Sequence, residues 1–495
     1  MENSGILRIK SKFFLIRVLS YFSFLLLPIW LQRGIELNLA GQCLLMTVYI
    51  LFMVSQWFLL GKEIDHRLKI YFKVNSSLDR VIYRLMLGKI ALVLYFLGLS
   101  LIPAHLVKHF FWGTWVVLGI FYSWPTRGKI VRETVTSELA EFRYLDSFEK
   151  TVLFLILLLF LFSLPELPVL NSTEALKLYF DSSELISEQY WTFMKLHYFP
   201  FLKRPELLKV GWCLHFYVIG MGLFLLTFYA ILRFFFARRL SILGVFALIS
   251  SWSYSKILGV KLGVSLPMSF SILWVWALIW IPKSSTYRLG LFIGLLGYLG
   301  TIINNNYYLL ILLQWSLLYL FLPKDKTYWY KRQFFKYSIF GIAISTMTFL
   351  FRIDENTLFN PLDWNVYIPQ VLKILDRKAF FSLCFPGVIL FIVRSVSKRA
   401  NILSGPHIDL SLINQFLTVF CSLAVYSILF EGTLVEYFSI MWILTFFSLI
   451  PIEWIFQSIS RLRSRRNMIF GVYAIICLLD SHFEGRVKIF LKLFS

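Results

Sequence analysis

Long uninterrupted runs of apolar side chains recur along this chain. Residues 216–236, FYVIGMGLFLLTFYAILRFFF, hold one charged side chain, and residues 151–164, TVLFLILLLFLFSL, hold none. A helix needs about 20 predominantly apolar residues to cross the hydrocarbon core of a bilayer. Only 15% of the residues are charged, whereas about a quarter is typical of soluble domains. The sequence therefore predicts an all-α polytopic integral membrane protein.

Apolar length and basic flanks together predict about fifteen transmembrane helices. The first apolar run has no small-residue cleavage site after it, so we expect it to remain as a helix. The expected spans lie near 13–31, 43–60, 90–107, 109–123, 151–165, 211–232, 240–258, 265–282, 289–303, 306–322, 337–351, 379–396, 411–430, 435–457 and 467–480.

The formal net charge of +22 comes from short basic clusters between the apolar runs, which is the pattern of cytoplasmic loops and not of a nucleic-acid-binding stripe. With a cytoplasmic N-terminus, every basic loop falls on the same side. Two long segments, 166–209 and 352–378, then lie outside. The basic loops are 61–73, 126–133, 233–239, 283–288, 324–336, 394–399 and 461–466.

Two parts are expected to join near residue 150. Residues 1–150 form four spans with long cytoplasmic loops, and residues 151–495 form about eleven spans with the two outside loops. The join, 135–150, is polar and amphipathic, which predicts a helix on the cytoplasmic surface. We expect a bacterial inner (plasma) membrane location.

The five cysteines do not pair with a nearby Cys or His at metal-ligand spacing, so neither a zinc site nor a disulfide framework is predicted. A Walker A loop, a Gly-x-Ser-x-Gly elbow and a His-Glu-x-x-His helix are also missing, which disfavours ATPase, hydrolase and zincin functions. The cysteines are Cys43, Cys213, Cys384, Cys421 and Cys477.

The first outside loop concentrates acid in an otherwise basic chain. Within LYFDSSELISEQYW, 178–191, the carboxylates of Asp181, Glu184 and Glu188 share one face of a helix. Aromatic residues follow at once, which predicts an amphipathic helix on the outer membrane surface. The alternative for each carboxylate is a solvated polar face. Lys203 and Arg204 come next, before the following span.

The second outside loop mixes the same side-chain types. Asp354 and Asp363 come early in 352–378, and Arg377 and Lys378 come late. Basic groups hold phosphate, and a carboxylate accepts a proton or a divalent cation. The two loops therefore predict a site for a lipid-linked phosphate at the membrane surface, with Lys203, Arg204, Arg377 and Lys378 as its phosphate-binding residues.

The order of elements over about 151–460 resembles the GT-C superfamily of polytopic glycosyltransferases. One span, an acidic outside loop, tightly connected spans and a second outside loop follow in that order. RLGLFIGLLGYLGTII, within 288–322, and VEYFSIMWILTFFSLIP, 435–451, look like two of its spans. The resemblance implies sugar transfer from a polyprenyl-phosphate donor, with Asp181 as catalytic base or metal ligand and Glu184 as its helper. This chain has DSSE there and not an adjacent Asp-Glu pair.

Residues 1–150 show a fainter similarity to the first four helices of UbiA-type prenyltransferases. LGIFYSWPTRGK, 118–129, looks like that family's loop after the fourth helix. Its Asn-x-x-x-Asp-x-x-x-Asp metal motif is missing, so no metal ligands are assigned, and Asp65, Asn75 and Asp79 are all that the corresponding loop offers.

Two other classes of function compete with glycosyl transfer. A transporter or lipid flippase usually buries ionisable groups in mid-membrane, and here Arg17, Glu436 and Glu453 lie near the ends of expected spans. A non-catalytic membrane scaffold is the other alternative.

Isolated histidines such as His105, His109 and His197 are usually structural or interfacial. The expected partners are membrane lipid and a lipid-linked sugar.

Overall fold

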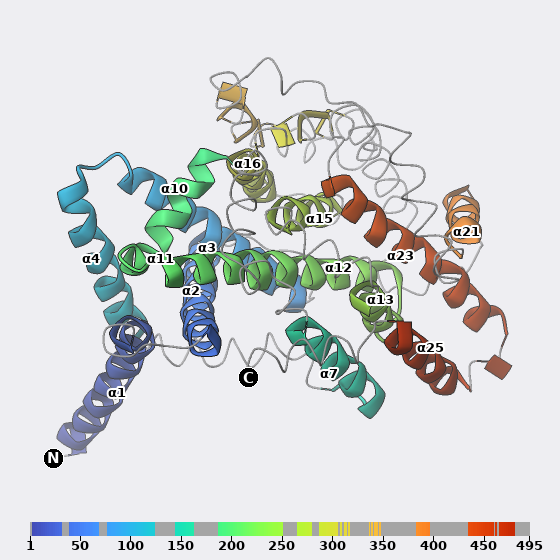
Figure 1. Cartoon of the computed structure of the whole chain (residues 1–495), viewed down its shortest axis with the longest axis horizontal. Helices are drawn as coiled ribbons and strands as arrows, with labels where there is room; N and C mark the ends of the chain where they lie inside the picture. The colour runs from blue at the N-terminus through green and yellow to red at the C-terminus, as the bar shows by residue number, and fades with distance from the viewer. Residues whose placement is uncertain are drawn as a thin grey trace. The chain divides into compact units, whose positions relative to one another are not determined.

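Every regular element that the structure describes is helical, which confirms the predicted all-α class (Figure 1). The structure is a computed structural model of the whole chain. It describes residues 2–31, 39–68, 77–123, 144–162, 187–250, 265–279, 287–304, short pieces between 307 and 347, 383–396, 434–459, 461–462 and 465–480.

Three helices within these ranges are long and apolar enough to cross a membrane, namely Leu39–Arg67, Ser77–Leu99 and Pro205–Phe235. Several shorter apolar helices accompany them, so the chain is a helical membrane protein. The count of fifteen spans and the orientation stay predictions. The expected span at 411–430 lies outside the described residues, and the spans near 306–322 and 337–351 are described only in pieces. The shorter helices are Phe14–Trp30, Ser269–Ile279, Gly290–Ile303, Cys384–Arg394 and Trp442–Ser458.

The chain divides into two compact units. Unit 1 contains the first four helices together with Glu188–His215, although the latter segment comes after the join expected near residue 150. Unit 2 contains the rest of the chain. The segments of unit 1 are Met1–Ile70, Asn75–Tyr144 and Glu188–His215, and those of unit 2 are Tyr71–Val74, Leu145–Ser187 and Phe216–Ser495.

Unit 1 is built around the pair α2 and α3. Asp65 of α2 accepts a 2.8 Å hydrogen bond from Arg84 of α3, and Gly88 lies against Trp57, so the two helices run antiparallel. α10 packs on α3, α11 packs on α2, and α1 contacts both α2 and α4. The helices of unit 1 are α1 (Glu2–Leu31), α2 (Leu39–Leu68), α3 (Ser77–Leu99), α4 (Ala104–Ser123), α10 (Glu188–His197), the short 3₁₀ turn η3 (Phe199–Phe201) and α11 (Pro205–Leu214).

α3 and α4 begin and end elsewhere than expected from apolar length. The third span was expected near 90–107, but α3 ends at Leu99 and Pro103 directly precedes α4. Proline at 103 disfavours helical backbone in the residue before it. At its other end α3 extends back to Ser77, because Leu78, Ile82 and further apolar side chains of its first turns are buried.

Unit 2 has α13 at its centre. Every residue from Leu240 to Ser250 is buried, as expected of a helix that is apolar all round. α13 packs against α7, α12, α23 and α25, while α12 also packs on α15, and α21 on α23. The helices are α7 (Ser147–Phe162), the π-helix η4 (His215–Met221, whose first residue belongs to unit 1), α12 (Gly222–Phe235), α13 (Arg238–Ser250), α15 (Ser265–Ile279), α16 (Tyr287–Ile303), α21 (Cys384–Val396), α23 (Leu434–Ser458) and α25 (Arg466–Asp480).

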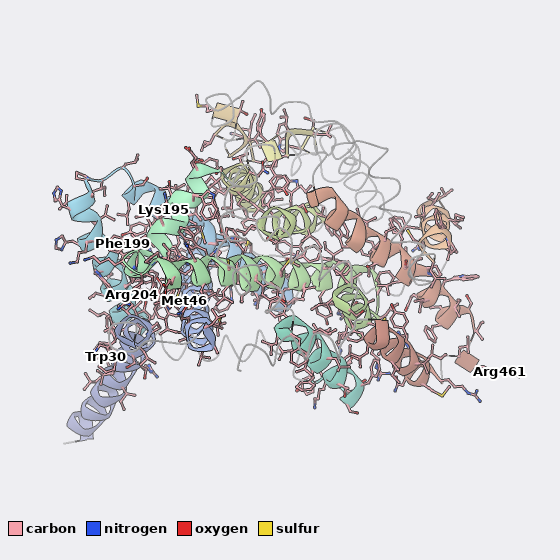
Figure 2. The ribbon with its side chains drawn as sticks, in the orientation of Figure 1. Trp30, Met46, Lys195, Phe199, Arg204 and Arg461 are labelled. Atoms are coloured by element: carbon pink, nitrogen blue, oxygen red, sulfur yellow. The ribbon has the colours of Figure 1, made fainter. Side chains whose placement is uncertain are left out.

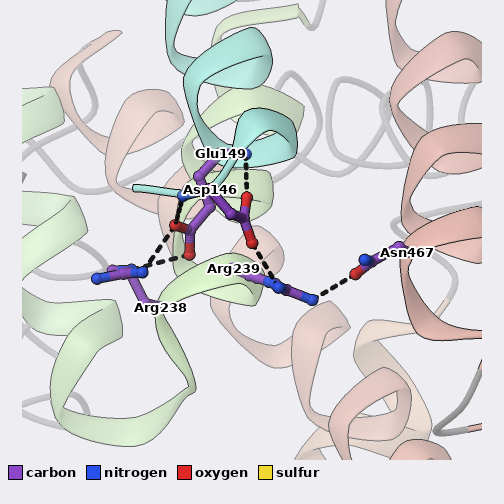
Figure 3. Close-up of polar contacts among 5 residues, drawn as sticks. All are labelled: Asp146, Glu149, Arg238, Arg239 and Asn467. Atoms are coloured by element: carbon purple, nitrogen blue, oxygen red, sulfur yellow. Dashed lines mark hydrogen bonds and ion pairs between the residues drawn. The ribbon is translucent and has the colours of Figure 1, made fainter. Parts of the chain in front are cut away.

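A polar network ties α7, α13 and α25 together (Figure 3). Asp146 and Glu149 cap the start of α7 reciprocally: Glu149 N–H donates to Asp146 Oδ1 at 2.7 Å and Asp146 N–H donates to Glu149 Oε2 at 3.0 Å. Arg238 donates to both carboxylate oxygens of Glu149, each at 2.8 Å. Arg239 pairs with Asp146 and donates to Asn467. The hydrogen bond to the carboxylate of Glu149 raises the pKa of Arg238, so the guanidinium stays protonated.

This network joins three segments that the charge pattern assigns to one side of the membrane. Residues 135–150, 233–239 and 461–466 are all cytoplasmic in the expected topology, and Glu149, Arg238 and Asn467 belong to or adjoin them. Their contact is compatible with that topology, which stays a prediction.

Candidate functional site

Two of the residues expected to bind phosphate, Lys203 and Arg204, lie exposed in the turn between η3 and α11. Arg204 occupies the N-cap position, where its N–H donates to Phe201 O at 2.8 Å and its carbonyl accepts from Leu208 N–H at 3.0 Å. Its backbone is therefore held while its side chain stays exposed. The other candidates, Asp181, Glu184, Arg377 and Lys378, lie outside the described residues.

α10 is buried on one side, although an amphipathic helix on the outer membrane surface was expected here. Tyr190, Phe193, Met194 and His197 follow the spacing of one helical face, and all four are buried. This face packs on α3. Glu188 and Lys195 are exposed. The aromatic side chain of Tyr190 thus packs inside unit 1 and not in the membrane interface.

The buried face of α10 meets a lysine in the middle of α3. Lys89 is only 2% exposed. Its Nζ lies 5.4 Å from the centre of the Trp57 ring and 5.6 Å from that of Tyr190, within the range of cation–π attraction. None of the described residues forms an ion pair with it. Lys89 therefore places an amine inside unit 1 without a carboxylate partner from this part of the chain.

His197, at the end of α10, is a fully enclosed polar side chain of this region. It is 0% exposed, and neither ring nitrogen has a hydrogen-bond partner among the described residues. Its ring lies 5.7 Å from that of Trp57 and 5.1 Å from that of Phe193, measured between centroids. Burial, and then the charge of Lys89, lower the pKa of His197 to about 3. The imidazole is therefore neutral at physiological pH.

A second histidine, His215, is held between two tyrosines. Tyr190 Oη lies 3.3 Å from its Nε2, and Tyr198 Oη lies 3.1 Å from its Nδ1. Burial raises the pKa of both phenols, so they remain protonated. With a neutral imidazole, one tyrosine donates to the bare nitrogen and the other accepts from the N–H. The rings of His215 and His197 lie 5.7 Å apart between centroids.

We call Trp57, Lys89, Tyr190, His197, Tyr198 and His215 the Lys89 cluster. They come from α2, α3, α10 and α11 with their flanking residues, and Tyr49 of α2 donates a 2.7 Å hydrogen bond to His197 O that fixes the end of α10. The cluster supplies hydrogen-bond donors and positive charge. Within the described ranges, no group of three or more His, Cys, Asp or Glu side chains is placed to hold a metal ion.

Sequence reasoning missed this cluster, although a signal was present. Lys89 interrupts the apolar stretch LMLGKIALVLYFLGL, 85–99, and the expected span began just after it. His215 stands alone in an equally apolar run. An ionisable side chain within an apolar helix marks a functional site by default. His197 was expected to be structural or interfacial, and its burial excludes the interface.

The fold and the site thus define an all-helical membrane protein that buries a lysine and two histidines beside tyrosine and tryptophan. No protein-family model, curated protein or solved structure matches this chain.

Proposed function

We propose that this chain is a membrane glycosyltransferase, which moves a sugar from a polyprenyl-phosphate donor to an acceptor on the outer face. The observation that carries the proposal is the exposed pair Lys203 and Arg204, directly before the 31-residue apolar span Pro205–Phe235. A cationic pair directly before the N-terminus of an apolar helix suits a ligand with a phosphate head and a lipid tail. The acidic stretch around Asp181 precedes it in the same loop.

The reaction needs a base and a group that stabilises the leaving phosphate. Asp181 takes the proton of the acceptor hydroxyl, whose oxygen attacks the anomeric carbon while the bond to the lipid phosphate breaks. Lys203 and Arg204, with Arg377 and Lys378 of the second outside loop, stabilise the polyprenyl phosphate that departs. Glu184 assists Asp181, and the pair holds a divalent cation if the reaction uses one.

The proposed setting is a bacterial inner membrane with the N-terminus in the cytoplasm. Sugar donor and acceptor then meet at the two outside loops, 166–209 and 352–378. The basic loops, which alternate without exception along the sequence, support this orientation. The meeting of Glu149, Arg238 and Asn467 in one network agrees with a shared side for their three segments.

The test is the turnover of Asp181→Asn, assayed as sugar transfer from a polyprenyl-phosphate sugar in lipid nanodiscs. Asparagine keeps the shape and removes the base, so we expect a loss of roughly a hundred- to ten-thousand-fold. Glu188→Gln is the matched control, because this exposed carboxylate lies in the same loop. Full turnover in both Asp181→Asn and Glu184→Gln would leave the catalytic role without a residue.

A transporter or lipid flippase is the second candidate, and Lys89 favours it. Transporters bury ionisable groups near mid-membrane, and Lys89 lies midway along α3, one of the three helices long enough to cross. Proteoliposomes that hold the chain would scramble or translocate an anionic lipid in this case. Lys89→Met would abolish that movement, and sugar transfer would be undetectable in the wild type.

A further inference from the structure

The Lys89 cluster holds polar groups whose partners do not come from the described part of the chain. Both ring nitrogens of His197 and the Nε1 of Trp57 are buried without a hydrogen-bond partner there, and Lys89 has no ion pair with a described residue. Buried polar groups in folded proteins are paired in the great majority of cases. Three such side chains in contact with one another therefore point to a missing group.

An acceptor that carries negative charge would satisfy these groups together. Lys89 brings three N–H donors, Trp57 brings one, and a neutral His197 brings one. Only the bare nitrogen of His197 is an acceptor among these atoms. An anion with several oxygens accepts from all three side chains at once and balances the charge of Lys89, and charge-assisted hydrogen bonds of this kind are the strong ones.

Cation–π contacts alone do not account for a buried ammonium. Each is weaker than the cost of burying one ion, even after relaxation. Lys89 makes two such contacts, with Trp57 and Tyr190. A bound anion would offset the remainder of this cost.

Lys89 and His197 both lie beside the indole of Trp57. Lys89 Nζ lies 5.4 Å from the centre of the Trp57 ring, and the His197 ring lies 5.7 Å from it. The backbones of α2 and α3 approach closely beside Lys89, where a Cβ added to Gly88 would overlap Trp57 O. Lys89 and Trp57 are thus held side by side by rigid helices, which is how a preorganised site is built.

We propose that the Lys89 cluster is a buried oxyanion-binding site, which takes a phosphate group between Lys89 and His197. The phosphate belongs either to a lipid headgroup or to a free ion, since both present the same oxygens. This inference does not depend on glycosyl transfer, which uses Lys203 and Arg204 at the exposed start of α11.

The experiment measures anion binding by the purified full-length chain in nanodiscs of neutral lipid. Radiolabelled inorganic phosphate and phosphatidic acid, added separately, serve as probes, and the melting midpoint is followed in parallel. A ligand that binds only the folded state raises this midpoint. A response to inorganic phosphate assigns a free ion, and a response to phosphatidic acid alone assigns a lipid.

Lys89→Met is the decisive variant and Lys195→Met its control. Lys195 is exposed on α10, so both variants lose one positive charge from unit 1 while only the first alters the cluster (Figure 2). We expect affinity to fall roughly tenfold or more in Lys89→Met and to stay unchanged in Lys195→Met. The melting midpoint of Lys89→Met without anion should equal or exceed that of the wild type, because methionine removes a buried charge.

His197→Gln is a second variant that keeps the proposal testable if Lys89→Met does not fold. Glutamine retains a donor but moves it, so a weaker affinity is again expected. Three results would overturn the inference: no binding of either probe to the wild type, wild-type affinity in the cluster variants, or an equal response to chloride, which has no oxygens.

Discussion

Gly88 of α3 lies directly against the backbone carbonyl of Trp57 in α2, and a Cβ at this position would overlap that oxygen. Gly61 of α2 is in the same situation against Arg84 of α3. Small residues let two membrane helices approach until their backbones meet, and dispersion contacts then hold them. The close approach fixes Lys89 and Trp57 beside each other, so the glycine at position 88 supports the Lys89 cluster.

Gly88→Ala therefore should separate α2 from α3. We expect a destabilisation of about 1 to 3 kcal/mol, as for overpacked cores, and a weaker anion response at the Lys89 cluster. Gly98→Ala is the control, because nothing lies within 4 Å of a Cβ at this position of the same helix. The control should gain up to about 1 kcal/mol from the better helix propensity of alanine. The melting midpoints of the two purified variants are compared, and equal midpoints would contradict the close approach of α2 and α3.

The network around Glu149 predicts a second loss of stability. Glu149→Gln removes the charge that pairs with Arg238 and weakens the reciprocal cap of α7, while leaving the shape unchanged. Because Glu149 is buried and Arg238 is about a third exposed, we expect a loss of roughly 2 to 3 kcal/mol. Lys150→Gln changes an exposed neighbouring charge and should have no effect. A Glu149→Gln variant that melts with the wild type would mean that the pair is fully screened.

Apolar length was sufficient to locate most of the helices, because in a bilayer each span must satisfy its own backbone hydrogen bonds. The spans expected at 265–282 and 435–457 correspond to α15 and α23 within a few residues. The start of α3 was missed because a criterion of apolar length excludes a charged residue, even one that pairs with a neighbouring helix. Arg84 does so with Asp65.

The Lys89 cluster could not be assembled from the sequence, because its members come from segments more than 100 residues apart. Lys89 and His197 meet only when α10 packs on α3. The pattern of α10 itself was ambiguous: Tyr190, Phe193 and His197 share a face whether that face meets lipid or protein. Of the candidate site, the sequence therefore predicted the exposed Lys203 and Arg204 but not the buried part.

The orientation can be tested by cysteine accessibility. Cysteines placed at Ser183 and Thr357 should react with an impermeant maleimide on intact cells, because both loops are expected outside. A cysteine at Ser147, exposed beside the Glu149 network, should react only after lysis. The wild type, whose described cysteines are mostly buried, gives the background. Labelling of Ser147→Cys on intact cells would contradict the expected orientation, and with it the proposed site in the outside loops.

The neutral state of His197 predicts a specific pH dependence of stability. Burial and Lys89 lower its pKa from 6.5 to about 3 in the folded chain, so the unfolded chain takes up a proton first as the pH falls. Stability is then complete above about pH 6.5 and declines below it, by at most about 1.4 kcal/mol per pH unit for this one proton. His197→Phe should flatten the acid side of a plot of melting midpoint against pH between 4 and 6.5. If His197→Phe keeps the wild-type slope, other groups carry the pH dependence.

The last prediction concerns phosphate binding at the exposed start of α11. Arg204 has its backbone fixed by Phe201 and Leu208 while its side chain is free to reach a ligand, and its planar fork engages two phosphate oxygens at once. Arg204→Ala should weaken the binding of polyprenyl phosphate in nanodiscs by roughly tenfold or more, without lowering protein yield. Lys203→Ala should have a smaller effect, because an ammonium acts as a single point charge.

Lys195→Ala removes an equally exposed charge from α10 and controls for a general loss of attraction to anionic lipid. If Arg204→Ala and Lys195→Ala weaken binding equally, Arg204 contributes long-range attraction and not a phosphate contact. A loss of affinity that is confined to Arg204→Ala and persists in 0.5 M salt assigns the phosphate to this turn, because salt screens only the long-range effects of exposed charges.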